Sequence, residues 1–180
     1  MPNHARVDRT ANLLGALSLV VTDRVADEIS GESGHSDSAA TALSAMHSFL
    51  ERPSIDRLRQ VLGLTSSGAV RLVDRLEAAG LVRREVGADA RSTAVALTPA
   101  GRRAAARVAT SRAQVLGDAL STLSPAERRQ FDSLISKVIV QFVRGPGAQR
   151  WMCRMCDTEA CGQPAGTCPV TRAARAGARP

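Results

Sequence analysis

Hydrophobic residues recur at helical spacing over most of the chain, and a strand-like pattern occurs once, near the middle. Apolar positions three or four apart predict a long helix near each end of the first 143 residues. The two stripes are Leu13, Leu17, Val20, Val21, Val25 and Ile29, and, after Ser124-Pro125, Phe131, Leu134, Ile135, Val138, Ile139 and Phe142. Both stripes need a partner surface. They could pack within one chain, but two terminal helices that flank a central module favour a dimer.

Between these flanks the pattern predicts two short helices joined by a tight turn. Apolar positions from Ile55 to Leu62 form one stripe, with Ser54 as N-cap and Gly63 as the break. Thr65 is placed to cap a second helix that ends at Ala79-Gly80. In that helix we expect the buried face to carry Val70, Val73 and Leu76.

The opposite face of the second helix combines small residues at its start with long cations further along. It carries Thr65, Ser66, Ser67, Gly68, Arg71 and Arg75. Hydroxyls and N–H groups at a helix start bind phosphate, and an arginine one turn on reaches a guanine edge or the backbone. We therefore predict a recognition helix for the major groove; the plainer interpretation is that Arg71 and Arg75 are solvated surface cations.

A hairpin follows, with Leu81–Val86 and Thr93–Leu97 as arms and period-2 alternation predicted on the second arm. Arg83 and Arg84 on the first arm are candidate DNA contacts. At the tip, Arg91 would suit a narrow minor groove, and Asp89 would orient it. Thr98-Pro99 then begins a new helix.

These residues together resemble the MarR family of winged helix-turn-helix regulators. The motifs are Leu76-Glu77-x-x-Gly80-Leu81-Val82, the wing Asp89-x-Arg91 and Leu97-Thr98-x-x-Gly101, and the resemblance spans roughly Thr10 to Val143. It implies a mainly α fold with a small β-wing, a homodimer on a pseudo-palindromic operator in double-stranded DNA, and usually repression. Ala90 departs from the family, since many relatives have a second arginine there.

The segments divide into N-terminal dimerisation helices (1–50), the winged helix-turn-helix (51–98), C-terminal dimerisation helices (99–144), a four-cysteine loop (145–170) and a disordered basic tail (171–180). The net charge of +7 favours a polyanionic partner. Residues 1–50 carry six acidic residues against three arginines, whereas every later part of the chain is net positive, so only the later parts are suited to DNA. The apolar run near the N-terminus is too short to span a bilayer, which leaves the cytoplasm as the expected location.

All four cysteines lie within sixteen residues, at Cys153, Cys156, Cys161 and Cys168. Gly and Pro between them predict a wrapping loop, and four thiolates in such a loop are typical of a metal site. Flanking Arg150 and Arg154 favour the thiolate form.

The metal is less defined than the ligands. A compact run that ends in Cys168-Pro169 favours an iron–sulfur cluster over structural zinc, and redox or gas sensing over a static role. The tail also resembles, over the loop alone and with different spacing, the cluster loop of SoxR-type sensors. Zinc, and free or disulfide-forming thiols, remain the alternatives.

Other functions are less well supported by the residues. No catalytic constellation is found, so a non-enzyme is expected. The family resemblance implies a small-molecule pocket between the winged lobe and the dimer helices, and His47 is a candidate lining residue or a packing residue. A further alternative is a protein-docking module held together by zinc.

Overall fold

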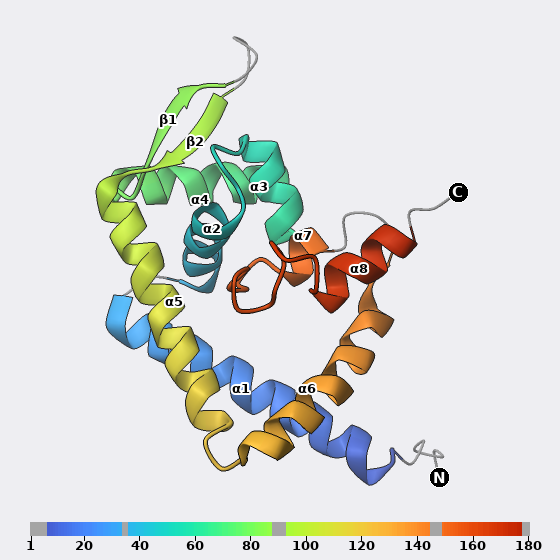
Figure 1. The fold of residues 1–180 in the computed structure, drawn as a ribbon. Helices are drawn as coiled ribbons and strands as arrows, with labels where there is room; N and C mark the ends of the chain where they lie inside the picture. Colours follow the sequence, from blue (N-terminus) through green and yellow to red (C-terminus); the bar gives the residue numbers. More distant parts are fainter. Residues whose placement is uncertain (1–6, 34–35, 88–92, 145–148, 178–180) are drawn as a thin grey trace, which may run out of the picture.

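The computed structural model describes residues 7–33, 36–87, 93–144 and 149–177. In chain order the elements are α1 (Arg9–Ser33), α2 (Asp37–Ser48), α3 (Ile55–Leu62), α4 (Ser66–Ala78), β1 (Val82–Val86), β2 (Thr93–Leu97), α5 (Pro99–Ala119), α6 (Pro125–Ile139), η1 (Val140–Phe142), α7 (Gln149–Met152) and α8 (Pro169–Ala176). The predicted class, mainly α with a small β-wing, is confirmed (Figure 1).

Side-chain caps start three of the helices where the sequence predicts them. Ser54, Thr65 and Thr98 each accept a hydrogen bond from the backbone N–H three residues on, at 3.1, 3.1 and 3.0 Å. Gly63 ends α3 in the left-handed conformation, with φ 66°. These caps satisfy amide groups that a helix start would otherwise leave unpaired, so the helix bounds follow from local chemistry.

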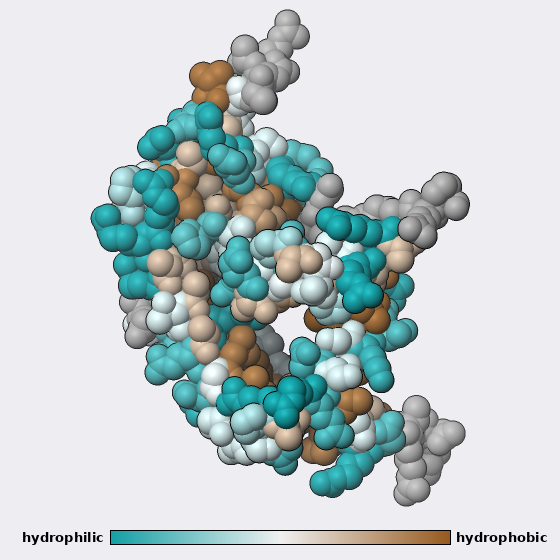
Figure 2. Space-filling view, viewed as in Figure 1, coloured by the Kyte–Doolittle hydropathy of each residue, from teal (hydrophilic) through white to brown (hydrophobic). Residues whose placement is uncertain are grey.

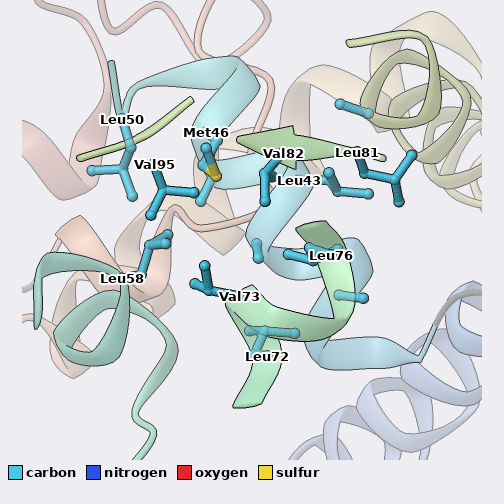
Figure 3. Packing of buried hydrophobic residues seen from close by; sticks show 14 of the residues in the cluster. Leu43, Met46, Leu50, Leu58, Leu72, Val73, Leu76, Leu81, Val82 and Val95 are labelled. Carbon is cyan, nitrogen blue, oxygen red and sulfur yellow. The ribbon is translucent and has the colours of Figure 1, made fainter. Parts of the chain in front are cut away.

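A single apolar core unites α2, α3, α4 and the wing (Figure 3). Leu43, Leu58 and Val73 lie fully buried where the three helices meet. Leu43 and Met46 on α2 pack into this core, so α2, which the sequence grouped with the rest of residues 1–50 as dimerisation helices, also belongs to the winged lobe. The winged lobe begins at α2.

The two strands pair antiparallel, with Val82 opposite Leu97 and Val86 opposite Thr93. The predicted alternation on the second arm is wrong, since Ala94, Val95 and Ala96 are all buried. β2 is therefore covered on both faces, and strands covered on both faces lose period-2 patterning. A third short segment pairs with its edge: the Val95 N–H donates to the Pro53 carbonyl at 2.8 Å, and Ser54 forms a bridge with Ala94.

Three long helices frame the rest of the molecule. Figure 1 shows α1 crossing α5, with α6 turning back from the end of α5 toward α7 and α8. Apolar side chains on this frame stay exposed: Leu13, Leu17 and Val20 on α1 and Leu134, Ile135 and Val138 on α6 each expose more than 40% of their surface. In the described part of the chain, no helix is long and apolar enough to cross a membrane.

The end of the chain is more ordered than the sequence indicated. A disordered tail from residue 171 is wrong for Thr171 to Ala176, which form most of α8. Val170, Thr171 and Ala174 on α8 are buried, and the helix lies against α6 and η1. The sequence pattern did not reveal this short amphipathic helix, because it consists mainly of small residues and two arginines.

Candidate nucleic-acid interface and cysteine loop

The N-terminal end of α4 presents a polar, sterically open surface. Ser66 and Ser67 are exposed, and the Thr65 hydroxyl holds the first turn through Gly68. A Cβ on Gly68 would lie 3.0 Å from the Thr65 Oγ1, so a glycine leaves room for the cap. Hydroxyls and the positive end of a helix dipole on one face are suited to phosphate.

The cations predicted on α4 lie on the same exposed face as this end. Arg71 and Arg75 are exposed, and Arg71 Nη2 lies 3.4 Å from the Ser67 Oγ one turn earlier. Val70, expected in the core, is 42% exposed, because Ala69, Leu72, Val73 and Leu76 form the buried face instead. An exposed aliphatic group beside these cations could contact a thymine methyl, so Val70 is a candidate DNA contact that the sequence pattern did not indicate.

Of the two arginines on β1, Arg84 is engaged in a network that joins the wing to α4. Its Nη2 lies 2.5 Å from the Asp74 carboxylate, and its Nη1 also pairs with Glu77. The Arg84 backbone N–H donates to the same Glu77 side chain at 3.0 Å. Arg84 is also a predicted DNA contact, and these pairs tie its side chain to α4 and so join the wing to that helix.

Arg83 is the more accessible of the pair, with a side chain 59% exposed. It pairs with Glu85 at 2.6 Å, and Arg52 pairs with the same carboxylate at 2.7 Å. Hydrogen bonding from Arg83, helped by the charge of Arg52, lowers the pKa of Glu85. The predicted wing-tip contacts, Asp89 and Arg91, lie outside the described residues.

The cysteine loop folds against the winged lobe. Cys153, Cys161 and Cys168 line one cavity of about 210 Å³, which Phe49 and Arg57 close from the side of the lobe. Cys168 is 3% exposed, and all four thiols are free. As the side chains stand, no set of three or more His, Cys, Asp or Glu among the described residues is arranged to hold a metal ion.

The fourth thiol, Cys156, lines a different cavity. A hydrogen bond from Cys153, together with the positive charge of Arg112, lowers the pKa of Cys156 to about 6 against the opposing effect of burial. The same hydrogen bond raises the pKa of Cys153, the donor. Of the two thiols, Cys156 is therefore the one whose ionisation this arrangement favours.

That second cavity, of about 590 Å³, lies between α1, α2, α5, α6 and the cysteine loop. Figure 2 shows an opening in the middle of the molecule in this region. Arg112 and Arg154 contribute cations, and Phe142 and Trp151 contribute aromatic surface. His47, a candidate for pocket lining or for packing, is exposed and lines a separate groove of about 420 Å³ together with Arg83 on β1 and Arg102 on α5.

A family model described as MarR family matches residues 33–92, which run from the end of α1 to the wing and stop well before the cysteine loop. The match covers the helix-turn-helix, Arg71 and Arg75 included. No match to a curated protein sequence was found.

Solved structures resemble the chain over most of its length. MepR, a transcription regulator of the Staphylococcus aureus multidrug efflux pump MepA, superposes with a TM-score of 0.66 at 16% identity, over 75% of this chain and 98% of that one. RV1404 from Mycobacterium tuberculosis gives a TM-score of 0.64 at 22% identity, over 77% and 97%. The M. tuberculosis MarR family protein RV2887, in complex with p-aminosalicylic acid, gives 0.56 at 24% identity, over 71% and 95%. The chain therefore has the winged-helix fold of these proteins, and its winged segment matches the MarR family model.

Proposed function

We propose that the protein is a MarR-type transcriptional regulator that binds a pseudo-palindromic operator as a homodimer and represses transcription. The observation that carries this is the face of α4, where Ser66, Ser67 and Arg71 surround a capped helix start and no described residue of the lobe covers them. A MepR mutant with the same fold has been solved bound to an oligodeoxyribonucleotide, at a TM-score of 0.56. The helix has the dimensions and side chains that a major groove accepts.

The test starts from a pool of random-sequence duplexes, because the operator is not known. Repeated selection on the full-length protein should enrich a sequence with two related half-sites about one helical turn apart. On that duplex, Arg71→Ala should weaken binding by about 5- to 150-fold, the range expected for one base-contacting arginine at about 1–3 kcal/mol.

Arg129→Ala is the matched control. This arginine is also exposed but lies near the start of α6, at the end of the molecule opposite the wing (Figure 1). The control should bind like the wild type. Enrichment of no sequence, or equal losses in both variants, would overturn the proposal and favour a winged helix that docks a protein.

Dimerisation is proposed through the exposed apolar faces of α1 and α6. Leaving Leu13, Leu17 and Leu134 in water is unfavourable, and a two-fold partner would cover the same residues on both copies. Sedimentation should give a dimer for the wild type and a monomer for Leu17→Glu. The control Leu19→Glu changes a leucine that is 67% exposed and lies on another face of α1, so it should stay dimeric.

A small-molecule effector is a second proposed partner, favoured by the cavity of about 590 Å³ with its two arginines. Its wall also includes Asp37, but the two arginines outnumber this carboxylate, and apolar walls with an excess of positive charge suit a small aromatic anion. Salicylate is a usable probe: it should raise the melting temperature of the wild type, and Arg112→Gln should remove that shift.

A further inference from the structure

The cysteine loop is docked onto the junction of three helices. Met155 packs with Ile29, Ala40 and Val108, which come from α1, α2 and α5 respectively. Thr41 on α2 also donates a hydrogen bond to the Met155 sulfur at 3.6 Å. At the two ends of the cysteine loop, α7 contacts α3 and α8 contacts α6 (Figure 1). A change of conformation within the loop would therefore alter contacts with both the winged lobe and the frame helices.

Tight turns in the loop bring its cysteines together. The Cys156 N–H donates to the Cys153 carbonyl at 2.9 Å, which closes the first Cys-x-x-Cys turn. Gly162 adopts φ 72°, and the Thr167 N–H donates to its carbonyl at 3.0 Å. That second turn reverses the chain between Cys161 and Cys168, so both reach the cavity that Cys153 lines.

The surroundings suit a negatively charged centre. The cavity of the three thiols is lined by Arg57 and by the polar side chains of Thr158, Gln163 and Thr171, and none of the described residues that line it is a carboxylate. Arg112 adds positive charge on the side of Cys156. Four thiolates around Zn²⁺ or a [4Fe–4S] cluster leave a net negative charge, which nearby cations and hydrogen-bond donors stabilise.

We propose that Cys153, Cys156, Cys161 and Cys168 together bind a thiophilic metal centre, either an iron–sulfur cluster or zinc. Three of the thiols already share one cavity, and Cys156, one turn from Cys153, supplies the fourth. Because Cys156 lines the cavity of about 590 Å³, binding requires its side chain to turn from that cavity toward the other three thiols. The adjacent Met155 sits in the helix junction, so metal binding is coupled to the packing of α1, α2 and α5.

The metal is tested on full-length protein purified without oxygen, by absorption spectroscopy and by iron, sulfide and zinc analysis. Brown protein with equal iron and acid-labile sulfide identifies a cluster, and colourless protein with about one zinc per chain identifies a zinc site. Either result supports the proposal. Protein that contains neither metal, and that fails to retain zinc or reconstituted iron and sulfide after desalting, overturns it.

Variants connect the metal to these thiols. Cys161→Ser and Cys168→Ser should each lose the metal, whereas Glu159→Gln, an exposed change in the same loop, should keep it. Circular dichroism and thermal unfolding show whether a serine variant is folded. Folded serine variants that bind as much metal as the wild type would place the metal elsewhere.

The coupling is measured separately and rests on the proposed function. Affinity for the selected operator duplex is compared in loaded and chelator-stripped protein, and we expect a change of at least fivefold in the wild type and none in Cys168→Ser. Bound metal with equal affinities would overturn the coupling and make the centre a static staple. Protein that binds metal but no duplex in either state would refute the proposed function and leave the metal site standing.

Discussion

Gly101 in the first turn of α5 sets how closely the wing can approach the frame helices. A Cβ at this position would overlap the Leu81 carbonyl oxygen and come within 2.9 Å of the Leu81 carbonyl carbon and 3.2 Å of the Leu97 Cδ2. The Leu81 carbonyl cannot move freely, since it accepts a hydrogen bond from the Thr98 N–H at 3.0 Å. Gly101→Ala therefore forces the junction between β1 and α5 apart.

The magnitude follows from two opposing terms. Alanine is favoured over glycine inside a helix by up to about 1 kcal/mol. Overpacking against backbone costs about 3 kcal/mol, the upper end of the range for a well-packed site, because no side-chain rotation relieves the clash. We expect Gly101→Ala to lower the free energy of unfolding by about 2 kcal/mol, which corresponds to a fall in melting temperature of about 4–8 °C for a chain of this size.

Gly117 near the end of the same helix supplies the matched control. A Cβ there would meet nothing within 4 Å, so Gly117→Ala should keep or raise stability by up to about 1 kcal/mol. Urea unfolding followed by circular dichroism measures both variants. If Gly101→Ala were as stable as Gly117→Ala, the close packing of the wing on α5 would be refuted.

Three further changes test other parts of the structure. Arg71→Ala should relax the base preference at one position of the selected operator, while Arg84→Ala, which loses its pairs with Asp74 and Glu77, should leave the base preference unchanged and lower the free energy of unfolding by about 1 kcal/mol; the same loss of base preference in both variants would contradict the assignment of Arg84 to wing positioning. Ser124→Ala should cost about 1 kcal/mol at neutral pH, because Ser124 and Glu127 form a capping box at the start of α6. Hydrogen bonds from Ser124 lower the pKa of Glu127. The stability that the ionised Glu127 adds to the capping box is therefore present above the unfolded pKa near 4.5 and is lost as the pH falls through the folded pKa. Unfolding curves should show a smaller difference in stability between Ser124→Ala and wild type at pH 3 than at pH 7. Met155→Ala should lower the free energy of unfolding by about 2 kcal/mol. It should also shift the fluorescence of Trp151, the single tryptophan, to longer wavelength, and an unchanged spectrum would show that the position of the loop does not depend on the helix junction.

Local chemistry made the helix-turn-helix predictable. The caps at Ser54, Thr65 and Thr98 and the left-handed Gly63 act within four residues, so their consequences can be read directly from the sequence. The exposed face of α4 followed from the same spacing. Val70 was misplaced because two registers of an apolar stripe fit this helix, and only packing against α2 and the wing chooses between them.

Contacts between distant segments were not predictable in the same way. Whether Arg84 faces DNA or Asp74 depends on the angle between wing and α4, which the strand pattern does not encode. The sequence did not show whether Leu43 and Met46 on α2 pack against α4 or against a second copy of the chain, and the structure places them in the core with α4. The spacing of the cysteines indicated a shared site, but the contact of Met155 with α1, α2 and α5 is a tertiary property.

This contact gives the molecule a physical route between its two candidate sites. Val108 of α5 touches the cysteine loop through Met155, and seven residues earlier Gly101 of the same helix lies against the wing junction. A helix transmits a small displacement along its length because its backbone hydrogen bonds resist bending. A shift at Met155 when Cys156 changes partners would therefore be felt where β1 meets α5. If that route operates, Met155→Ala should uncouple operator affinity from metal content while leaving metal binding intact, and retention of full coupling in this variant would direct attention instead to α3, which α7 contacts directly.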